Sequence, residues 1–354
     1  MLPIRETMYK GGFSMAEPIL SVRDLVVHFS LRGQTLTAIR GASLDLYQGE
    51  SLAIVGESGS GKSVLTKSFM GMLDGNGHID GGTIRFDGEN IAAYTTEKEW
   101  LKIRGKRISM VFQDPMTTLS PLMPVGKQIA ETLTLHQGLR GRAAKQRAIE
   151  ILRDMGIVNP EKRYKQYPHE FSGGMRQRVV IAIACNPEIL ICDEPTTAQQ
   201  AQILHLLRDL QKQYGLTLIY ITHDLGVVAN VADRIAVMYA GDIVEIGTSD
   251  EIFFDARHPY TWALLSSLPQ LGEHGKDLFA IAGTPPNLFR PVRGDAFAPR
   301  NPYVLKIDFE YRPPYFDITP THKARTWLLD PRAPHIARPA CLDKIAEMGG
   351  YIHD

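Results

Sequence analysis

The stretch Gly56-Glu57-Ser58-Gly59-Ser60-Gly61-Lys62-Ser63 decides the fold of this chain. It follows the pattern G-x-x-x-x-G-K-[ST] of a phosphate-binding loop. Glycines let backbone amides curl around phosphate oxygens, and a helix that starts here adds partial positive charge. Lys62 can reach the outer phosphates of a nucleotide, and the hydroxyl of Ser63 can hold Mg²⁺. The loop therefore predicts a nucleotide site.

The sequence on either side of the loop supports this interpretation. Residues 51–55 are a short apolar run that is typical of a buried strand, and residues 64–70 can continue as a helix. Strand, glycine loop and helix in this order separate a phosphate loop from a glycine-rich turn with a chance lysine. We therefore expect an α/β fold built around the loop.

The composition is that of an ordinary globular protein. The chain has 354 residues, enough for two domains, with 44% hydrophobic and 22% charged residues. Lys plus Arg and Asp plus Glu both number 39, which gives no support for a nucleic-acid binder. No apolar run approaches the roughly 18 residues that a membrane span needs. The 3 cysteines form no C-x-x-C pair, so we expect neither a disulfide framework nor a zinc site. A reducing cytoplasm is the expected compartment.

The pattern along the chain predicts alternating strands and helices. Residues 19–46 should form strands with a turn near 32–34, and residues 81–88 a hairpin strand. The segment 125–167 is predicted to be helical, with breaks at glycines 138 and 156. Further strands are expected at 107–112, 189–192, 217–221, 235–238 and 243–246, and an amphipathic helix at 200–213.

Polar side chains come directly after several of these predicted strands. Gln113, the pair Asp193 and Glu194, and His223 each follow an apolar run. Ligand sites of open α/β sheets lie at such strand ends. Paired acids beside a phosphate loop suit Mg²⁺ binding and the activation of water. A lone histidine at a strand end is more often structural than catalytic, so both roles stay open for His223.

Two further candidates have ordinary structural alternatives. Ser172 before a helical run is a good N-cap, and Gly173 and Gly174 let the backbone approach an anion. As a lone motif, these three residues are also typical of a plain helix cap. Phe29 could stack on an adenine ring, although a core aromatic on a strand is the more common role.

Taken together, these motifs resemble the nucleotide-binding subunits of ATP-binding cassette transporters, over about residues 19–340. Five motifs appear in the order that the family shows. They are the phosphate loop at 56–63, the Q-loop glutamine Gln113, the signature Ser172-Gly173-Gly174, the Walker B pair Asp193 and Glu194, and the switch histidine His223. Phe29 matches the position of the family's adenine-stacking aromatic.

The resemblance implies a fold and a domain organisation. The fold is a P-loop NTPase core of the RecA-like α/β class, with an antiparallel β subdomain, a helical signature subdomain and a Pro-rich C-terminal extension. Residues 1–18 are expected to be a disordered tail without a secretory signal. The nucleotide-binding domain is expected at 19–267, its helical subdomain at about 114–178, and the extension at 268–354.

Three segments, one shortly before the extension and two within it, resemble the oligopeptide and dipeptide importer branch. They are His258-Pro259-Tyr260-Thr261, Gly283-Thr284-Pro285-Pro286-Asn287 and Gly294-Asp295-Ala296-Phe297-Ala298-Pro299-Arg300-Asn301. Some relatives carry cysteines in the last segment. Here Asp295 and Asn301 appear instead, so we predict no iron–sulfur cluster or disulfide. The nickel-importer cassettes are close cousins that the sequence separates poorly.

The resemblance also implies a mechanism with ATP and Mg²⁺. Two subunits pair head to tail, and each ATP lies between one chain's phosphate loop and the other chain's signature residues. By analogy, Glu194 polarises the attacking water, and Asp193 with Ser63 organises Mg²⁺. Gln113 contributes to the metal site and senses the γ-phosphate, which His223 contacts. Because half of each site comes from another chain, the isolated subunit should hydrolyse ATP poorly.

The expected partners follow from the same resemblance. They are a second cassette, which we expect to be a paralogue, two transmembrane permease subunits and, indirectly, an extracellular peptide-binding protein. Nucleic acid is not among them. The chain is expected at the cytoplasmic face of the cell membrane, as a peripheral protein.

Two places depart from the family pattern. The spacing from Ser172 to Asp193 is slightly short, with the gap near Cys185. After Ala198 the family continues with the Leu-Asp of the D-loop, whereas here Gln199 and Gln200 follow at once. The second gap is about four residues, which leaves a helical phase error of only ~40°, so the amphipathic face beyond it can survive.

The leading interpretation is the ATPase subunit of a peptide importer. Because the D-loop is missing, a subunit that binds ATP but hydrolyses it weakly stays an alternative. The nickel-importer cassette is a further alternative. A cassette protein of DNA repair or translation would usually carry tandem cassettes or a coiled-coil insertion. A small-molecule kinase would not need the signature Ser172-Gly173-Gly174.

Overall fold

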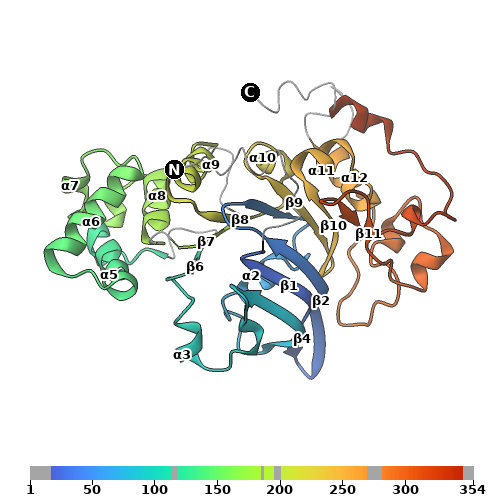
Figure 1. Cartoon of the computed structure of the whole chain (residues 1–354), viewed down its shortest axis with the longest axis horizontal. Helices are drawn as coiled ribbons and strands as arrows, with labels where there is room; N and C mark the ends of the chain where they lie inside the picture. The colour runs from blue at the N-terminus through green and yellow to red at the C-terminus, as the bar shows by residue number, and fades with distance from the viewer. Residues whose placement is uncertain (1–16, 113–117, 185–186, 195–200, 269–280, 346–354) are drawn as a thin grey trace. The chain divides into compact units, whose positions relative to one another are not determined.

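The computed structural model describes residues 17–112, 118–184, 187–194, 201–268 and 281–345 of the chain (Figure 1). Its internal contacts divide the chain into two compact units. The first unit comprises the residues up to Tyr47, Leu52–Ala93 and the residues from His223 onward. The second comprises Gln48–Ser51 and Tyr94–Thr222. The domain boundaries that we predicted from the sequence stay a prediction.

A four-stranded antiparallel sheet forms the N-terminal part of the first unit. Its order is β2-β1-β4-β5, with β1 at Leu20–Leu31, β2 at Gln34–Leu46, β4 at Gly77–Phe86 and β5 at Glu89–Asn90. The two residues between β1 and β2 both have positive φ, 49° and 76°, as a tight hairpin turn requires. This is the predicted turn near residue 33, and the sheet matches the expected antiparallel β subdomain.

The phosphate loop of the first unit follows strand β3. This strand spans Ser51–Val55, and from Leu52 it runs parallel to β9, at Arg234–Tyr239. Strand β10 at Asp242–Thr248 continues antiparallel, followed by the short strands β12 at Lys323–Ala324 and β11 at Phe316–Asp317. Every residue of β3 and β9 is buried, which explains why both are continuous apolar runs.

The helices of the first unit are short. They are α2 at Lys62–Ser68, α10 at Leu225–Val228, α11 at Ser249–Phe254 and α12 at Pro259–Ser266. Beyond α12, the described residues 281–345 hold the two short strands and several single 3₁₀ turns. Because proline lacks an amide hydrogen and fixes φ, its density here accounts for this irregular structure.

The second unit contains three parallel strands in the order β8-β7-β6. They span Thr217–Thr222, Ile189–Asp193 and Ile108–Val111, close to the predicted positions. The helices are α3 at Glu97–Trp100, α5 at Val125–Gln137, α6 at Gly141–Asp154, α7 at Pro160–Arg163, α8 at Gly173–Ile183 and α9 at Ala201–Tyr214. Helices α5, α6 and α8 pack against one another.

The helix breaks in the second unit lie where the sequence predicts them. Gly138 ends α5 with φ of 70°, and Gly156 follows α6 with φ of 69°. Only glycine adopts this left-handed conformation without steric cost. None of the helices in the described part of the chain combines the length and the apolar composition that crossing a bilayer needs.

Candidate nucleotide-binding site

The phosphate loop joins the end of β3 to the start of α2. The ammonium group of Lys62 lies 2.7 Å from the carbonyl oxygen of Gly56 and 2.9 Å from that of Glu57. The amide of Ser60 also donates to the Glu57 carbonyl, at 3.1 Å. These bonds curl the loop backbone around the positive charge that the motif provides for phosphates.

Two of the loop's glycines are required by close packing. A Cβ on Gly56 would lie 2.1 Å from the carbonyl oxygen of Met238 on β9. Gly61 has φ of 105°, and a Cβ there would lie 3.0 Å from the carbonyl oxygen of Ala38 on β2. The backbone of β9 therefore leaves no room for a side chain at Gly56, and the positive φ of Gly61 would strain any other residue there.

Glu57, the second residue of the loop, is held by two groups from the C-terminal part of the chain. Its amide donates to the hydroxyl of Tyr260, at 2.9 Å. Its carboxylate accepts two hydrogen bonds from the guanidinium of Arg300, at 2.6 and 3.0 Å. Sequence reasoning missed both residues as neighbours of the loop. The available signal was their place in the two segments that resemble the peptide-importer branch.

Phe29 on β1 is 9% exposed. Its ring packs against Gly77 of β4, where a Cβ would come within 2.5 Å of a ring carbon. The two residues face each other in the β1–β4 register. This packing agrees with the core role that is common for a strand aromatic, and adenine stacking by Phe29 stays a prediction.

His223 belongs to the first unit and is exposed. It follows β8 directly, at the strand end where the sequence places it. The next residue, Asp224, caps α10 by accepting the amide of Gly226 at 2.9 Å. This cap begins helix α10 immediately after the histidine.

The paired acids lie in the second unit. Asp193 is the last residue of β7, and Glu194 follows it. Glu194 has φ of 44°, and its amide donates to the carbonyl of Ile221 on β8 at 2.8 Å. A left-handed conformation costs a non-glycine residue about 1–2 kcal/mol. Strain of this kind gathers at functional sites, which suits the candidate catalytic carboxylate.

The signature residues begin α8 in the second unit. The hydroxyl of Ser172 accepts the amide of Met175 at 3.4 Å, which confirms the predicted N-cap. Gly173 and Gly174 are exposed, and a Cβ on either would meet nothing within 4 Å. Packing within the described part of the chain thus does not require glycine at these two positions. They leave a helix N-terminus open to an anion.

The structure groups the predicted site residues within the two units. The phosphate loop, Phe29 and His223 lie in the first, while the signature and the acids Asp193 and Glu194 lie in the second. Gln113 is outside the described residues, as are the two places where the sequence departs from the family pattern. The metal-binding role of Ser63, Asp193 and Gln113 stays a prediction.

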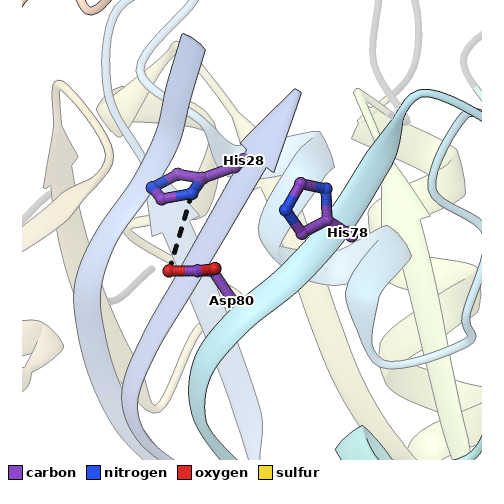
Figure 2. Close-up of side chains that lie close together, drawn as sticks. All are labelled: His28, His78 and Asp80. Carbon is purple, nitrogen blue, oxygen red and sulfur yellow. Dashed lines mark ion pairs between the residues drawn. The ribbon is translucent and has the colours of Figure 1, made fainter. Parts of the chain in front are cut away.

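A separate group of potential metal ligands lies on the antiparallel sheet (Figure 2). His28 of β1 faces His78 of β4, and with Asp80 their ligand atoms lie within 4.8 Å of one another. His28 Nδ1 is 3.6 Å from a carboxylate oxygen of Asp80, whose side chain is 55% exposed. Metal ligands are normally oriented by further hydrogen bonds, and the described residues show none for this group. We therefore assign no ion to it.

Two protein families match the chain. One, described as ABC transporter, matches residues 39–197. The other, described as the C-terminal region of oligopeptide/dipeptide transporters, matches residues 244–307. The second match contains Tyr260 and Arg300, the two residues that hold the phosphate loop.

Similar proteins span almost the whole chain. The oligopeptide transport ATP-binding protein AmiE of Streptococcus pneumoniae is 54% identical over 345 residues, which are 95% of this chain and 97% of AmiE. The oligopeptide transport ATP-binding protein OppD of Bacillus subtilis is 56% identical over 91% of this chain and 92% of its own length. The dipeptide transport ATP-binding protein DppD of Lactococcus lactis is 53% identical, over 90% and 93%.

Solved structures share the fold. The ATP-binding cassette MJ0796, described as a dimer in a post-hydrolysis state with ADP and Pi, matches with a TM-score of 0.57 and 25% identity. That match covers 65% of this chain and 98% of MJ0796. The cassette cbiO1 of Clostridium perfringens matches with a TM-score of 0.59 and 30% identity, over 68% of this chain and 92% of its own. The predicted P-loop NTPase fold is confirmed, and the chain belongs to the ATP-binding cassette ATPases of the ABC transporter family, with the C-terminal region of oligopeptide/dipeptide transporters.

Proposed function

We propose that the chain is the ATP-hydrolysing subunit of an importer of oligopeptides or dipeptides. The sequence identity of 54% with AmiE, over 95% of the chain, is the observation that carries this proposal. A nickel importer is less supported. The family matched at residues 244–307 and the three similar proteins named above all bear the names of peptide transporters.

ATP is the nucleotide that the family binds, and the site residues suit its magnesium complex. Ser63 and Asp193 offer a hydroxyl and a carboxylate, and oxygen donors of this kind are those that Mg²⁺ prefers. The ion would neutralise the charge of the phosphates. Lys62 adds its own positive charge at the outer phosphates, so the loop stabilises charge without taking part in covalent chemistry.

Hydrolysis in this proposal depends on residues at the strand ends. Glu194 polarises the attacking water as a general base, and its left-handed backbone fixes where the carboxylate starts. His223 contacts the γ-phosphate, and Gln113 reports its presence. Each residue gains its effect from position, which is how phosphoryl transfer is catalysed in enzymes of this class.

The second half of each site comes from another cassette. The open helix N-terminus at Gly173 and Gly174 supports this, because the described packing of the chain itself does not require glycine there. We propose that a paralogous cassette binds head to tail. Two permease subunits would anchor the pair at the cytoplasmic face of the membrane, with an extracellular peptide-binding protein acting indirectly.

The test is ATP-dependent peptide uptake by the assembled transporter. The chain is co-expressed with candidate permeases and a partner cassette. Uptake is then measured into reconstituted vesicles that hold ATP inside, for the wild type and for Glu194→Gln. We expect this variant to keep ATP binding and to lose hydrolysis and uptake. Glu188→Gln is the matched control. Glu188 directly precedes strand β7, which Glu194 follows, and it pairs with Arg107 at the surface. Unchanged uptake in Glu194→Gln contradicts the proposal.

A second candidate is a cassette that binds ATP but turns it over weakly. The sequence Ala198-Gln199-Gln200, without the Leu-Asp of the D-loop, favours it. In that case the assembled complex binds ATP and hydrolyses it slowly even with peptide present. An ordinary rate of ATP-driven uptake rejects this candidate.

A further inference from the structure

The contact between the phosphate loop and the C-terminal region is a shielded, two-point ion pair. The guanidinium of Arg300 lies 2.6 and 3.0 Å from the two carboxylate oxygens of Glu57. The Arg300 side chain is 4% exposed and that of Glu57 is 28% exposed. A bidentate pair with this geometry has a defined orientation, unlike the loose ion pairs of protein surfaces.

Each nitrogen of the Arg300 guanidinium also donates a hydrogen bond to a group other than Glu57. Nε donates to the carbonyl of Ala282 at 2.9 Å, and Nη2 donates to that of Ile281 at 3.2 Å. Nη1 donates to the hydroxyl of Tyr239 at 3.3 Å, and the group lies 5.8 Å from the centre of that ring. Only the planar fork of an arginine can make these bonds at once, so lysine is no equivalent here.

Tyr260 provides the second point of attachment. Its hydroxyl accepts the Glu57 amide at 2.9 Å, and its side chain is fully buried. Burial lowers the pKa of His258 to about 4, so this ring is neutral and its Nδ1 accepts the amide of Tyr260, at 3.0 Å. The Tyr260 ring packs against Tyr239 and Phe297, with centroids 4.6 and 5.3 Å away.

The two attachments act on the atoms that hold Lys62. The Glu57 amide shares a rigid peptide plane with the Gly56 carbonyl, so the bond to Tyr260 orients that carbonyl, which accepts a bond from Lys62 at 2.7 Å. The carbonyl of Glu57 itself accepts bonds from Lys62 and Ser60. Arg300 also neutralises a carboxylate that lies within the phosphate loop. Without this neutralisation, the negative charge of Glu57 would oppose the negative charge of a nucleotide's phosphates.

We propose that Arg300 and Tyr260 are positioning residues for ATP, through which the C-terminal region shapes the phosphate loop. The inference rests on the proposed function, since it concerns the same nucleotide site. It assigns the peptide-transporter C-terminal region a part in nucleotide binding by its own chain. Neither residue touches the nucleotide in this proposal; both act through Glu57.

The experiment measures the affinity of the purified full chain for a fluorescent ATP analogue, N-methylanthraniloyl-ATP, with Mg²⁺. Arg300→Gln should weaken binding about tenfold or more, because it leaves the Glu57 charge without a partner. The double variant Glu57→Gln/Arg300→Gln should recover most of this loss, because the opposing charge is gone. Tyr260→Phe should weaken binding without any change of charge.

A matched control comes from the same C-terminal region. Arg332 forms a two-point pair with Asp330, both bonds at 2.8 Å, but its side chain is 85% exposed. Arg332→Gln should leave the affinity unchanged. In the assembled transporter, Arg300→Gln should raise KM for ATP far more than it lowers kcat, a split that a general loss of fold would not produce.

The outcomes separate the inference from the proposed function. If the wild-type chain does not bind the analogue, the proposed function fails. If the wild type binds it and Arg300→Gln and Tyr260→Phe bind equally well, the inference is overturned. Should Arg300→Gln fail to fold, a folded double variant whose affinity is near that of the wild type supports the role of charge neutralisation. A folded double variant with no measurable affinity rejects that role.

Discussion

A carboxylate oxygen of Glu245 lies 2.8 Å from Nε2 of His322, and neither side chain is exposed to solvent. Glu245 belongs to β10, and His322 directly precedes β12. The same carboxylate accepts the amides of Arg257 and His258, at 2.6 and 3.1 Å. One buried acid thus joins strand β12 to the start of helix α12. That helix carries Tyr260, whose hydroxyl binds the phosphate loop. Glu245 therefore supports this attachment indirectly, by holding the start of the helix.

Replacing Glu245 by alanine is expected to destabilise the chain strongly. The buried amide of His258, the half-buried amide of Arg257 and the His322 ring would lose their acceptor. Breaking a buried pair of this kind costs about 3–5 kcal/mol. Unfolding by urea, followed by circular dichroism, measures the change in unfolding free energy. Glu161→Ala is the control, because its pair with Arg153 is exposed and should contribute at most about 1 kcal/mol. Equal losses in both variants contradict the prediction.

Gly174→Ala is expected to separate stability from activity. Because a Cβ at this position meets nothing within 4 Å, the unfolding free energy should stay unchanged or rise by at most about 1 kcal/mol. The added methyl group would lie where the partner cassette's ATP is proposed to bind, so the ATPase rate of the assembled complex should fall. Gly75→Ala, which also meets open space, should change neither quantity. A full ATPase rate in Gly174→Ala argues against the proposed shared site.

The local parts of the fold could be predicted from the sequence. The apolar run of β3, the glycine loop and the glycines that end α5 and follow α6 each carry their own signal, because backbone conformation there depends on nearby residues. Strand β4 was predicted only from residue 81, whereas it begins at Gly77. Its first residues pair with Phe29 and His28 of β1, a tertiary contact that their own β-propensity does not show.

The attachment of the phosphate loop could not be predicted in this way. Glu57 and Arg300 are 243 positions apart, and Glu57 and Tyr260 are 203 apart. Periodicity and spacing report which residues share a helix or a strand, but not which distant segments meet. The family resemblance marked the segments that hold Tyr260 and Arg300 without giving a physical reason for them. Their contact with the loop provides one.

Asp295 should make the stability of the chain depend on pH. Burial, with a smaller contribution from the charges of Asp308 and Asp242, raises its pKa to about 7, while the Phe297 amide and Arg40 act in the opposite direction. The folded chain therefore holds this proton to a higher pH than the unfolded chain. By linkage, the unfolding free energy falls as the pH rises from about 4 to about 7, and levels off above that.

Asp295→Asn tests this dependence. Asparagine keeps the acceptor for the Phe297 amide but cannot ionise, so stability should fall less between pH 5 and pH 8 than in the wild type. The difference should be about 2–3 kcal/mol, since one unit of pKa corresponds to about 1.4 kcal/mol. Chemical unfolding at the two pH values gives the comparison, with the exposed Asp317→Asn as control. Parallel losses in wild type and Asp295→Asn contradict the assignment.

Restoring a D-loop should raise the turnover of the assembled transporter. In the family that the chain resembles, Leu-Asp follows the position of Ala198 and crosses the dimer interface between the two ATP sites, whereas Gln199 follows here. Inserting Leu-Asp and two further residues after Ala198 would change the helical phase by only ~40°, so the apolar face of α9 can keep its contacts.

The expected result of this insertion is a higher ATPase rate with an unchanged affinity for ATP, because the phosphate loop is untouched. An insertion of four glycine and serine residues at the same place restores length without the Asp carboxylate. If both insertions raise the rate equally, the length of the segment limits turnover and not the carboxylate. If neither changes a rate that is already coupled to peptide uptake, the short segment suffices for the connection between the two sites, and the weakly hydrolysing alternative is rejected.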